Sequence, residues 1–399
     1  MKKHNVVIVG GGFGGIKTAL DLSDDDRFRI TLITDHTDFR YYPSLYRTAT
    51  GGKRVLSSIP LSELFAGKKI NIINDTAISI DRKARTVLTK VKHVVGYDAL
   101  VLAMGVHTNY FHIQGLEELS YGIKTIEDAE KLKHYLHDQL LINKKPDLNY
   151  VVVGGGPTGI ELAAVLPAYI KQIIAKHGLQ PRKFHVDLVE ASPRLVPRSP
   201  KDISRRLTRQ LRKLGVKLYL KTTVQAQTVE ALMANNKPIR SHTVIWTAGV
   251  SNNSFFADQG FQLAGNSKVR VDQFLQTEMG IYVIGDNADT PYSGMAQTAL
   301  YDGKFIARNL KLLANGAEPK PYIAKRPVYV FSAGRRWAAV QWGSLRIYGR
   351  LGWMLRSVAD LIGYHDYEPW WRAGKRWVQE DDSEESCPTC RTSPSVAAK

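Results

Sequence analysis

The chain has 399 residues, of which 55 are lysine or arginine and 37 are aspartate or glutamate, so its formal net charge is +18. Charged residues make up 23% and hydrophobic residues 44%, a composition that is typical of a globular protein and excludes global disorder. At roughly 100–200 residues per domain, this length predicts two or three domains. The two cysteines, Cys387 and Cys390, both lie near the carboxyl end. No disulfide can therefore cross the fold, and no cysteine in the body of the chain can act as a nucleophile or redox centre.

The first 35 residues read as a strand, a glycine loop, a helix and a second strand. Val6–Val9 is a short buried strand, too short for the apolar centre of a signal peptide. The loop that follows carries G-x-G-x-x-G at Gly10, Gly12 and Gly15. In this motif the first glycine makes the tight turn, the second admits the pyrophosphate, and the third lets helix and strand pack closely. Asp35 ends the second strand, where a carboxylate can bind ribose hydroxyls, so the unit predicts a dinucleotide site.

A second copy of this unit begins 144 residues later. The strand 150–153 is followed by the same spacing at Gly154, Gly156 and Gly159, and the strand 185–189 ends at Glu190. A carboxylate at this place would bind a free ribose 2′-hydroxyl and repel a 2′-phosphate, which favours NADH over NADPH. Arg194 lies close enough in sequence to weaken that preference.

Three further apolar segments, residues 97–105, 243–250 and 280–286, each end in small residues where backbone can pass close to a ligand. With the two glycine loops they predict an α/β fold of two Rossmann-like dinucleotide-binding domains. Two such folds in one chain usually hold a flavin and a nicotinamide, with hydride passing between them.

On these motifs the sequence resembles type II NADH dehydrogenase, a two-dinucleotide-binding-domain flavoprotein family, from about residue 5 to about residue 378. The matching segments also include 42–46, 49–51, 158–161, 284–286 and 296–299. The resemblance implies FAD in the first fold and NADH in the second. The implied FAD residues are Gly10, Gly12, Phe13, Gly14, Gly15, Asp35, Ala103, Gly105, Gly285, Asp286, Gln297 and Thr298. The implied NADH residues are Gly154, Gly156, Pro157, Thr158, Gly159, Glu190, Ala248 and Gly249.

The resemblance further implies Glu161, Gln297 and Tyr301 as catalytic residues and a membrane quinone as electron acceptor. Disulfide reductases and sulfide:quinone reductases of this superfamily rely on internal cysteines, which this chain lacks. One departure concerns the acceptor side, because Tyr301 and Asp302 replace two glutamines of the family motif. An NAD(P)H-dependent reductase of a soluble carrier such as ferredoxin therefore stays open as the alternative. A nucleic-acid-binding flavoprotein ranks last, since no nucleic-acid-binding motif is present.

Between residues 325 and 378 the chain carries ten basic and three acidic residues together with six of its seven tryptophans. Residues 348–362 show helical spacing of apolar side chains, at Leu351, Met354, Leu355, Val358, Leu361 and Ile362. Such a helix can pack on the core, or it can lie in a membrane interface. We expect the second arrangement, with Arg350, Arg356, Arg372 and Arg376 turned toward anionic headgroups. No stretch approaches the roughly 20 apolar residues that span a bilayer, so a peripheral protein on the cytoplasmic side of the membrane is expected.

These patterns predict five parts: 1–118 and 266–325 as two halves of an FAD-binding domain, 119–265 as an inserted NADH-binding domain, 326–378 as a membrane-association segment, and 379–399 as a disordered acidic tail. Cys387 and Cys390 fall in that tail. No metal site and no nucleic-acid partner are expected, and the oligomeric state stays open, with a homodimer as one option.

Overall fold

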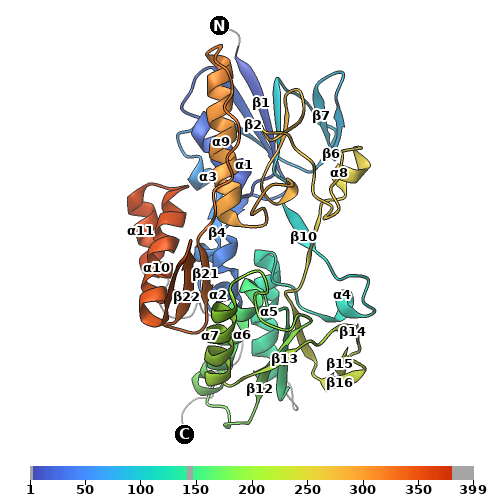
Figure 1. The fold of residues 1–399 in the computed structure, drawn as a ribbon, viewed down its shortest axis with the longest axis vertical. Helices are drawn as coiled ribbons and strands as arrows, with labels where there is room; N and C mark the ends of the chain where they lie inside the picture. The colour runs from blue at the N-terminus through green and yellow to red at the C-terminus, as the bar shows by residue number, and fades with distance from the viewer. Residues whose placement is uncertain (1–2, 142–146, 380–399) are drawn as a thin grey trace.

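A computed structural model describes residues 3–141 and 147–379. Two units built around parallel sheets lie one above the other along the long axis, and the carboxyl-terminal segment lies beside them (Figure 1). The tail 380–399, with both cysteines, lies outside the described residues.

The upper unit contains a six-stranded sheet, whose strands pair in the order β19-β20-β9-β1-β2-β5. All neighbours are parallel except β19 and β20. Val6–Val9 is at most 3% exposed, because β1 lies in the middle of the sheet and is covered on both faces. The bounds are β1 (His4–Val9), β2 (Phe28–Thr34), β5 (Ile70–Asn74), β9 (Ala99–Leu102), β19 (Gln276–Glu278) and β20 (Ile281–Val283), with helices α1 (Phe13–Leu22) and α9 (Ala296–Ala314) packed against each other.

The lower unit contains a four-stranded parallel sheet in the order β13-β12-β11-β17. Its bounds are β11 (Asn149–Val153), β12 (His185–Glu190), β13 (Val216–Leu220) and β17 (Thr243–Trp246), with helices α5 (Ile126–Leu141), α6 (Pro157–Lys176) and α7 (Lys201–Lys213). By length and composition α6 could cross a membrane, contrary to the expectation that no such stretch exists. It begins at the second glycine loop and lies in the hydrophobic core, so we assign it as a core helix.

Smaller elements connect and extend the two sheets. Antiparallel strands β10 (Val106–Thr108) and β18 (Val250–Asn252) pair where the chain passes between the two units. Two three-stranded sheets are formed by β6 (Ala77–Asp81), β7 (Thr86–Thr89) and β8 (Val94–Gly96), and by β14 (Val224–Gln227), β15 (Ala231–Ala234) and β16 (Lys237–Arg240). The remaining short strands and α-helices of the two units are β3 (Asp38–Arg40), β4 (Ser58–Pro60), α2 (Leu45–Ala49), α3 (Leu61–Leu64), α4 (Leu116–Leu119) and α8 (Phe255–Asp258). The two predicted Rossmann-like folds are therefore confirmed.

The carboxyl-terminal segment contains a small antiparallel sheet that the sequence analysis did not predict. Its strands are β21 (Tyr329–Ser332), β22 (Ala338–Trp342) and β23 (Leu345–Tyr348), and they lead into helices α10 (Gly349–His365) and α11 (Trp370–Val378). The predicted helix is therefore present as α10.

Helix α10 exposes apolar side chains and buries charged ones. Leu351, Met354, Val358 and Ile362 are 48–66% exposed, whereas Gly352, Arg356, Asp360 and Tyr364 are buried. The apolar stripe of this helix therefore faces outward, and the alternative in which it packs on the core is wrong for these four side chains.

Two of the arginines expected at the headgroups point inward instead. Arg356 is buried in an ion pair with Asp360 and also donates to the carbonyl oxygen of Pro43 at 3.3 Å. Arg376 is 5% exposed and pairs with Glu368 at 2.6 Å and with Glu63 at 3.0 Å. A buried guanidinium needs such partners. These arginines hold the carboxyl-terminal segment against the rest of the protein. The expectation that Arg356 and Arg376 contact lipid headgroups is therefore wrong.

Candidate active site

The first glycine loop connects β1 to α1, and each of its motif glycines has a separate structural reason. Gly10 has φ +112°, and a Cβ there would overlap the carbonyl oxygen of Ala103. A Cβ on Gly15 would overlap the carbonyl oxygen of Gly10, so this glycine permits helix and strand to approach. Gly12 has ordinary extended backbone and nothing within 4 Å of an added Cβ. The open space at Gly12 lies at the amino end of α1, where free N–H groups bind phosphate.

A cavity surrounds this loop at the carboxyl ends of the parallel strands. Phe13 and Gly14 line it, as do Asp35 after β2, Ala103 and Gly105 after β9, and Gly285 and Asp286 after β20. This is the place where open α/β sheets bind ligands. The structure thus brings the predicted residues of the first fold to one cavity, except Gly15, which packs against Gly10 and Ile8, and Gln297 and Thr298 on α9. Nothing lies within 4 Å of an added Cβ at Gly12 or Gly105, so both lining glycines leave open space for a ligand.

Sequence reasoning missed a histidine that lines this cavity and an asparagine that binds the backbone of the lining residue Gly105. His36 pairs with Asp35 at 2.6 Å, and hydrogen bonding to this ring lowers the pKa of the Asp35 carboxyl. Asn287 exchanges hydrogen bonds with the backbone of Gly105, accepting from its N–H at 2.9 Å and donating to its carbonyl oxygen at 2.6 Å. His36 adjoins the expected acid in sequence and could have been found there. Asn287 acts across 182 residues, and no local pattern signals it.

The second glycine loop, between β11 and α6, repeats the geometry of the first. Gly154 has φ +118°, and a Cβ on Gly159 would overlap the carbonyl oxygen of Gly154. Gly156 has φ −80° and open space around an added Cβ, and Pro157 and Thr158 are exposed in the first turn of α6. A second phosphate-binding helix terminus is therefore present.

Glu190 is held against this second loop. Its Oε2 accepts a hydrogen bond from the Gly155 N–H at 2.5 Å, and its Oε1 accepts one from the Ser192 N–H at 2.7 Å. The guanidinium of Arg194 donates to Ser199 O at 2.6 Å and Ser204 Oγ at 3.0 Å. The Arg194 guanidinium is therefore held by Ser199 and by Ser204 of α7, and its hydrogen bonds are not directed to Glu190.

Ala248 and Gly249 follow β17 at the same end of the second sheet. A Cβ on Gly154 would lie 3.0 Å from the Ala248 nitrogen, which shows how closely this segment approaches the loop. Gly249 has φ +91°, and its carbonyl oxygen accepts from the Asn109 N–H at 3.3 Å. Ala248 therefore borders the second loop, and Gly249, the next residue, contacts Asn109.

Glu161 lies in the first turns of α6 and is buried. Its Oε1 accepts a long hydrogen bond of 3.4 Å from the Ser332 N–H of β21. Burial raises the pKa of this carboxyl to about 7, against the opposing effect of the nearby Arg356 charge. Glu161 can therefore exchange a proton near neutral pH. Glu161 is therefore a buried carboxyl group and not one exposed on the surface of the helix.

The predicted catalytic residues of α9 lie against the chain segment that leads into β21. Gln297 Oε1 accepts from the Val328 N–H at 2.8 Å, and the Lys325 ammonium lies 5.2 Å from the ring centre of Tyr301. Residues 325–332 thus contact Gln297, Tyr301 and also Glu161 of the other unit. The neighbouring Thr298 binds another segment: its hydroxyl donates to the Tyr292 carbonyl oxygen at 2.9 Å.

Asp302, which stands where the family motif has a glutamine, has a structural role that was not predicted. Its Oδ2 accepts from the Gly285 N–H at 2.9 Å, and its Oδ1 accepts from the Tyr322 hydroxyl at 2.6 Å. Complete burial raises the pKa of this carboxyl to about 6. Asp302 therefore ties α9 to the loop that carries Asp286.

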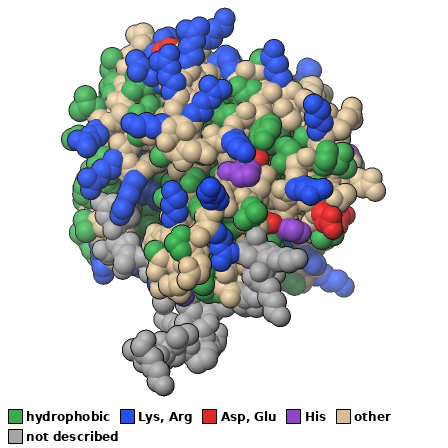
Figure 2. Space-filling model, turned by 90° about the horizontal axis from the view of Figure 1, so that it is seen from below, with side chains coloured by type: hydrophobic (Ala, Val, Ile, Leu, Met, Phe, Trp, Pro, Cys, Tyr) green, Lys and Arg blue, Asp and Glu red, His purple; other side chains and the backbone are tan. Residues whose placement is uncertain are grey.

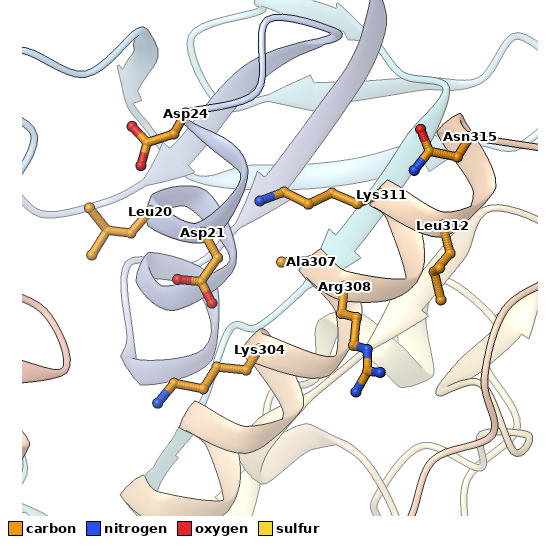
Figure 3. A pocket seen from close by; sticks show the side chains of 9 residues that line it. All are labelled: Leu20, Asp21, Asp24, Lys304, Ala307, Arg308, Lys311, Leu312 and Asn315. Carbon is orange, nitrogen blue, oxygen red and sulfur yellow. The ribbon is translucent and has the colours of Figure 1, made fainter. Parts of the chain in front are cut away.

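A separate groove on the outer side of α1 and α9 lies away from both glycine loops. Figure 3 shows its charged rim, with Asp21 and Asp24 on one side and Lys304, Arg308 and Lys311 on the other. It has no glycine loop and no free helix amino end, so we do not assign a nucleotide to it.

Comparison with known proteins agrees with this geometry. The chain is 27% identical to a type II NADH:quinone oxidoreductase, NdhA, of Mycobacterium tuberculosis, over 91% of this chain and 85% of that protein. Its fold matches NDH2 of Plasmodium falciparum, solved with NADH, with a TM-score of 0.82 at 17% identity, covering 95% and 97% of the two chains. It also matches a ferredoxin reductase of Rhodopseudomonas palustris, with a TM-score of 0.72 at 21% identity and 93% and 97% coverage.

A family model described as pyridine nucleotide-disulphide oxidoreductase matches residues 4–303, a span that includes both glycine loops and the first turns of α9. The chain belongs to the pyridine nucleotide-disulphide oxidoreductase family.

Proposed function

We propose that the chain is an FAD-dependent oxidoreductase that takes a hydride from NADH and passes electrons to a membrane quinone. The observation that carries this proposal is the presence of two complete dinucleotide loops in a chain whose body contains no cysteine. The acceptor must then receive electrons without a thiol relay. The curated relative from Mycobacterium tuberculosis is named for this activity.

The first unit would hold FAD through Gly10, Gly12, Gly15, Asp35 and Asp286. The second would hold NADH through Gly154, Gly156, Gly159 and Glu190. Both loops fit, because each has open space at its middle glycine where a side chain would block the phosphates. Bound FAD supplies the two-electron chemistry, and the protein supplies binding, orientation and electrostatics. We keep the domain bounds 1–118, 119–265, 266–325 and 326–378 as part of this proposal.

Glu190 is proposed to select NADH. Its carboxylate is fixed by two backbone N–H groups and remains close to the loop, where it can accept hydrogen bonds from ribose hydroxyls. A 2′-phosphate would meet this negative charge, and the guanidinium of Arg194 is directed toward Ser199 and Ser204.

Glu161, Gln297 and Tyr301 are proposed to act on the acceptor side. Glu161 would hold a proton on its carboxyl group and release it as the acceptor is reduced, which its pKa of about 7 permits. Gln297 and Tyr301 would orient the acceptor with an amide and a phenol. The segment 325–332 supports this arrangement, because it contacts all three residues.

We further propose that the outward stripe of α10 rests in the boundary of a bilayer, on the cytoplasmic side, where the quinone resides. Leu351, Met354, Trp370 and Trp371 are 55–67% exposed, and aromatic and apolar side chains of this kind favour a membrane interface. This large apolar surface would be costly to leave in water. A homodimer remains one option for the assembly.

The alternative acceptor is a soluble carrier, and the fold shared with a ferredoxin reductase supports keeping it. Steady-state NADH oxidation with menadione, with a ferredoxin and with no added acceptor separates the two. We expect menadione to support turnover well above the other two conditions. Turnover with ferredoxin but not with menadione would overturn the quinone proposal.

A further inference from the structure

One face of the lower unit carries basic side chains that the proposed reaction does not use. Helix α7 contains six basic residues and one acidic residue, and it buries Ile203, Leu207 and Leu211 against the core. The side chains that remain exposed on it include Arg205, Arg206, Arg209, Arg212 and Lys213. Lys and Arg side chains cover much of this end of the molecule, with few acidic ones among them (Figure 2).

Helix α7 contacts the hairpin formed by β22 and β23. Asp202, its single acid, accepts a hydrogen bond from the Tyr348 hydroxyl at 2.7 Å and pairs with Arg346 at 2.8 Å. The guanidinium of Arg206 lies 5.3 Å from the ring centre of Tyr348. The carboxylate of Asp202 is therefore paired with side chains of the hairpin.

A second contact brings two more cations to the same place. The Gln210 side chain donates to the Ala333 carbonyl oxygen at 3.1 Å, so the loop that carries exposed Arg335 and Arg336 lies beside the second half of α7. We define the α7 cationic surface as Arg206, Arg209, Lys213, Arg335 and Arg336.

The apolar side chains next to this surface are also exposed. Trp342 and Leu345 at the tip of the hairpin are 62% and 54% exposed, and Leu351 and Met354 continue the apolar surface along α10. Strand β23 leads directly from Leu345 through Arg346 to Tyr348, which contacts Arg206. By the register of β22 and β23, Trp342 and Leu345 lie on one face of the hairpin, and Arg346 and Tyr348 lie on the other face, toward α7. The cations of α7 and the exposed apolar side chains therefore flank the same short hairpin.

Such a surface fits a lipid bilayer better than a protein or a nucleic acid. Like charges one helical turn apart, such as Arg209 and Lys213, repel each other, and an anionic counter-surface relieves that repulsion. Anionic headgroups attract cations near the membrane, while adjacent apolar side chains enter the acyl boundary. The proximity of the α7 cations to the exposed apolar side chains, on the two sides of one short hairpin, is the basis for choosing the bilayer.

We propose that the α7 cationic surface binds the anionic headgroups of a bilayer, so that the NADH-binding unit itself contacts the membrane beside the carboxyl-terminal segment. This inference rests on the proposed function, in which the acceptor is a membrane quinone. It assigns the electrostatic part of membrane binding to α7 and the 335–336 loop, in place of the buried Arg356 and Arg376.

The test uses the full chain with bound cofactor and vesicles of phosphatidylcholine with or without phosphatidylglycerol. One variant changes the five residues of the α7 cationic surface to Gln, and a second changes its four arginines to Lys. A matched control changes five exposed cations on other elements to Gln, namely Lys83, Lys90, Lys92, Lys237 and Arg240. Thermal denaturation of each variant checks that it is folded.

We expect the Gln variant to lose at least tenfold in affinity for phosphatidylglycerol vesicles at low salt, with little change for neutral vesicles. The Lys variant and the matched control should stay within about threefold of the parent protein. An unchanged Gln variant, or an equal loss in the matched control, would overturn the proposal. Retained vesicle binding with lost binding to polyglutamate would overturn it too, since an acidic protein would then be the partner. Menadione reduction in vesicle-free buffer tests the proposed function separately.

Discussion

Replacing the middle glycine of one loop with valine tests one nucleotide site without changing the other. At Gly12 the backbone has φ −90° and ψ −170°, which valine adopts readily, and no atom lies within 4 Å of the new Cβ. We therefore expect Gly12→Val to change the unfolding free energy of the cofactor-free protein by no more than about 1 kcal/mol. The branched side chain would instead occupy the place where the phosphates of FAD approach the amino end of α1.

The loss of binding can be estimated from the hydrogen bonds that the phosphates would make there. Losing two charge-assisted bonds at about 1.5–3 kcal/mol each weakens binding by at least about 3 kcal/mol, or roughly a hundredfold. Gly12→Val should therefore purify without flavin but with a melting temperature close to that of the cofactor-free parent protein.

The same substitution at Gly156 should leave flavin bound and abolish NADH-dependent turnover, because φ there is −80° and the space is again open. Gly15→Ala is the contrasting variant, since its Cβ would overlap the Gly10 carbonyl oxygen and destabilise the fold itself. The ratio of flavin to protein absorbance and the melting temperature report both effects. A Gly12→Val protein with a full complement of flavin would refute the assignment of FAD to the first unit.

Three further outcomes follow from single side chains. The parent protein should prefer NADH over NADPH by roughly 10–100-fold in kcat/KM, corresponding to about 1.5–3 kcal/mol. Glu190→Gln should make this ratio smaller. Equal kcat/KM for the two cofactors in the parent protein would contradict the role of Glu190. Because the pKa of Glu161 is about 7, its protonated fraction falls as pH rises through neutrality. Quinone reduction should therefore slow above pH 7 in the parent protein, and this pH dependence should be lost in Glu161→Gln. Identical pH–rate profiles of the two proteins would exclude Glu161 as the proton donor. Arg356→Met leaves the buried Asp360 carboxylate with the longer ion pair to Arg47 at 3.5 Å, and it should lower the unfolding free energy by up to about 3–5 kcal/mol. The exposed Arg350→Gln should change it by no more than about 0.5 kcal/mol, and similar effects of the two variants in thermal denaturation would argue that Arg356 is not buried.

The glycine loops could be predicted because their constraints are local. Gly10 and Gly154 need positive φ, Gly15 and Gly159 need close approach, and all of this follows from a short strand, a turn and a helix. The same reasoning placed Glu190 at the end of its strand.

Residues that act across the chain could not be predicted in this way. The carboxyl group of Asp302 binds the Gly285 N–H, and Asn287 binds the backbone of Gly105, through tertiary contacts that leave no periodic signal.

The carboxyl-terminal helix shows where a correct pattern still leads to a wrong contact. Helical spacing identified which side chains of α10 share a face, but it does not state which face packs inward. Arg356 and Asp360 share the buried face because their opposite charges neutralise each other there, and Leu351 and Met354 are left outside. The small sheet β21–β23 was missed because its strands are only four or five residues long.

The central claim is that NADH and a quinone act in turn on one flavin held by the first glycine loop. It is tested most directly by anaerobic titration of the purified protein, with the visible absorption of the flavin recorded after NADH and again after menadione. We predict that one equivalent of NADH bleaches the flavin absorption and that menadione restores it without oxygen. A flavin that NADH does not bleach, or that stays bleached after menadione, would contradict the account.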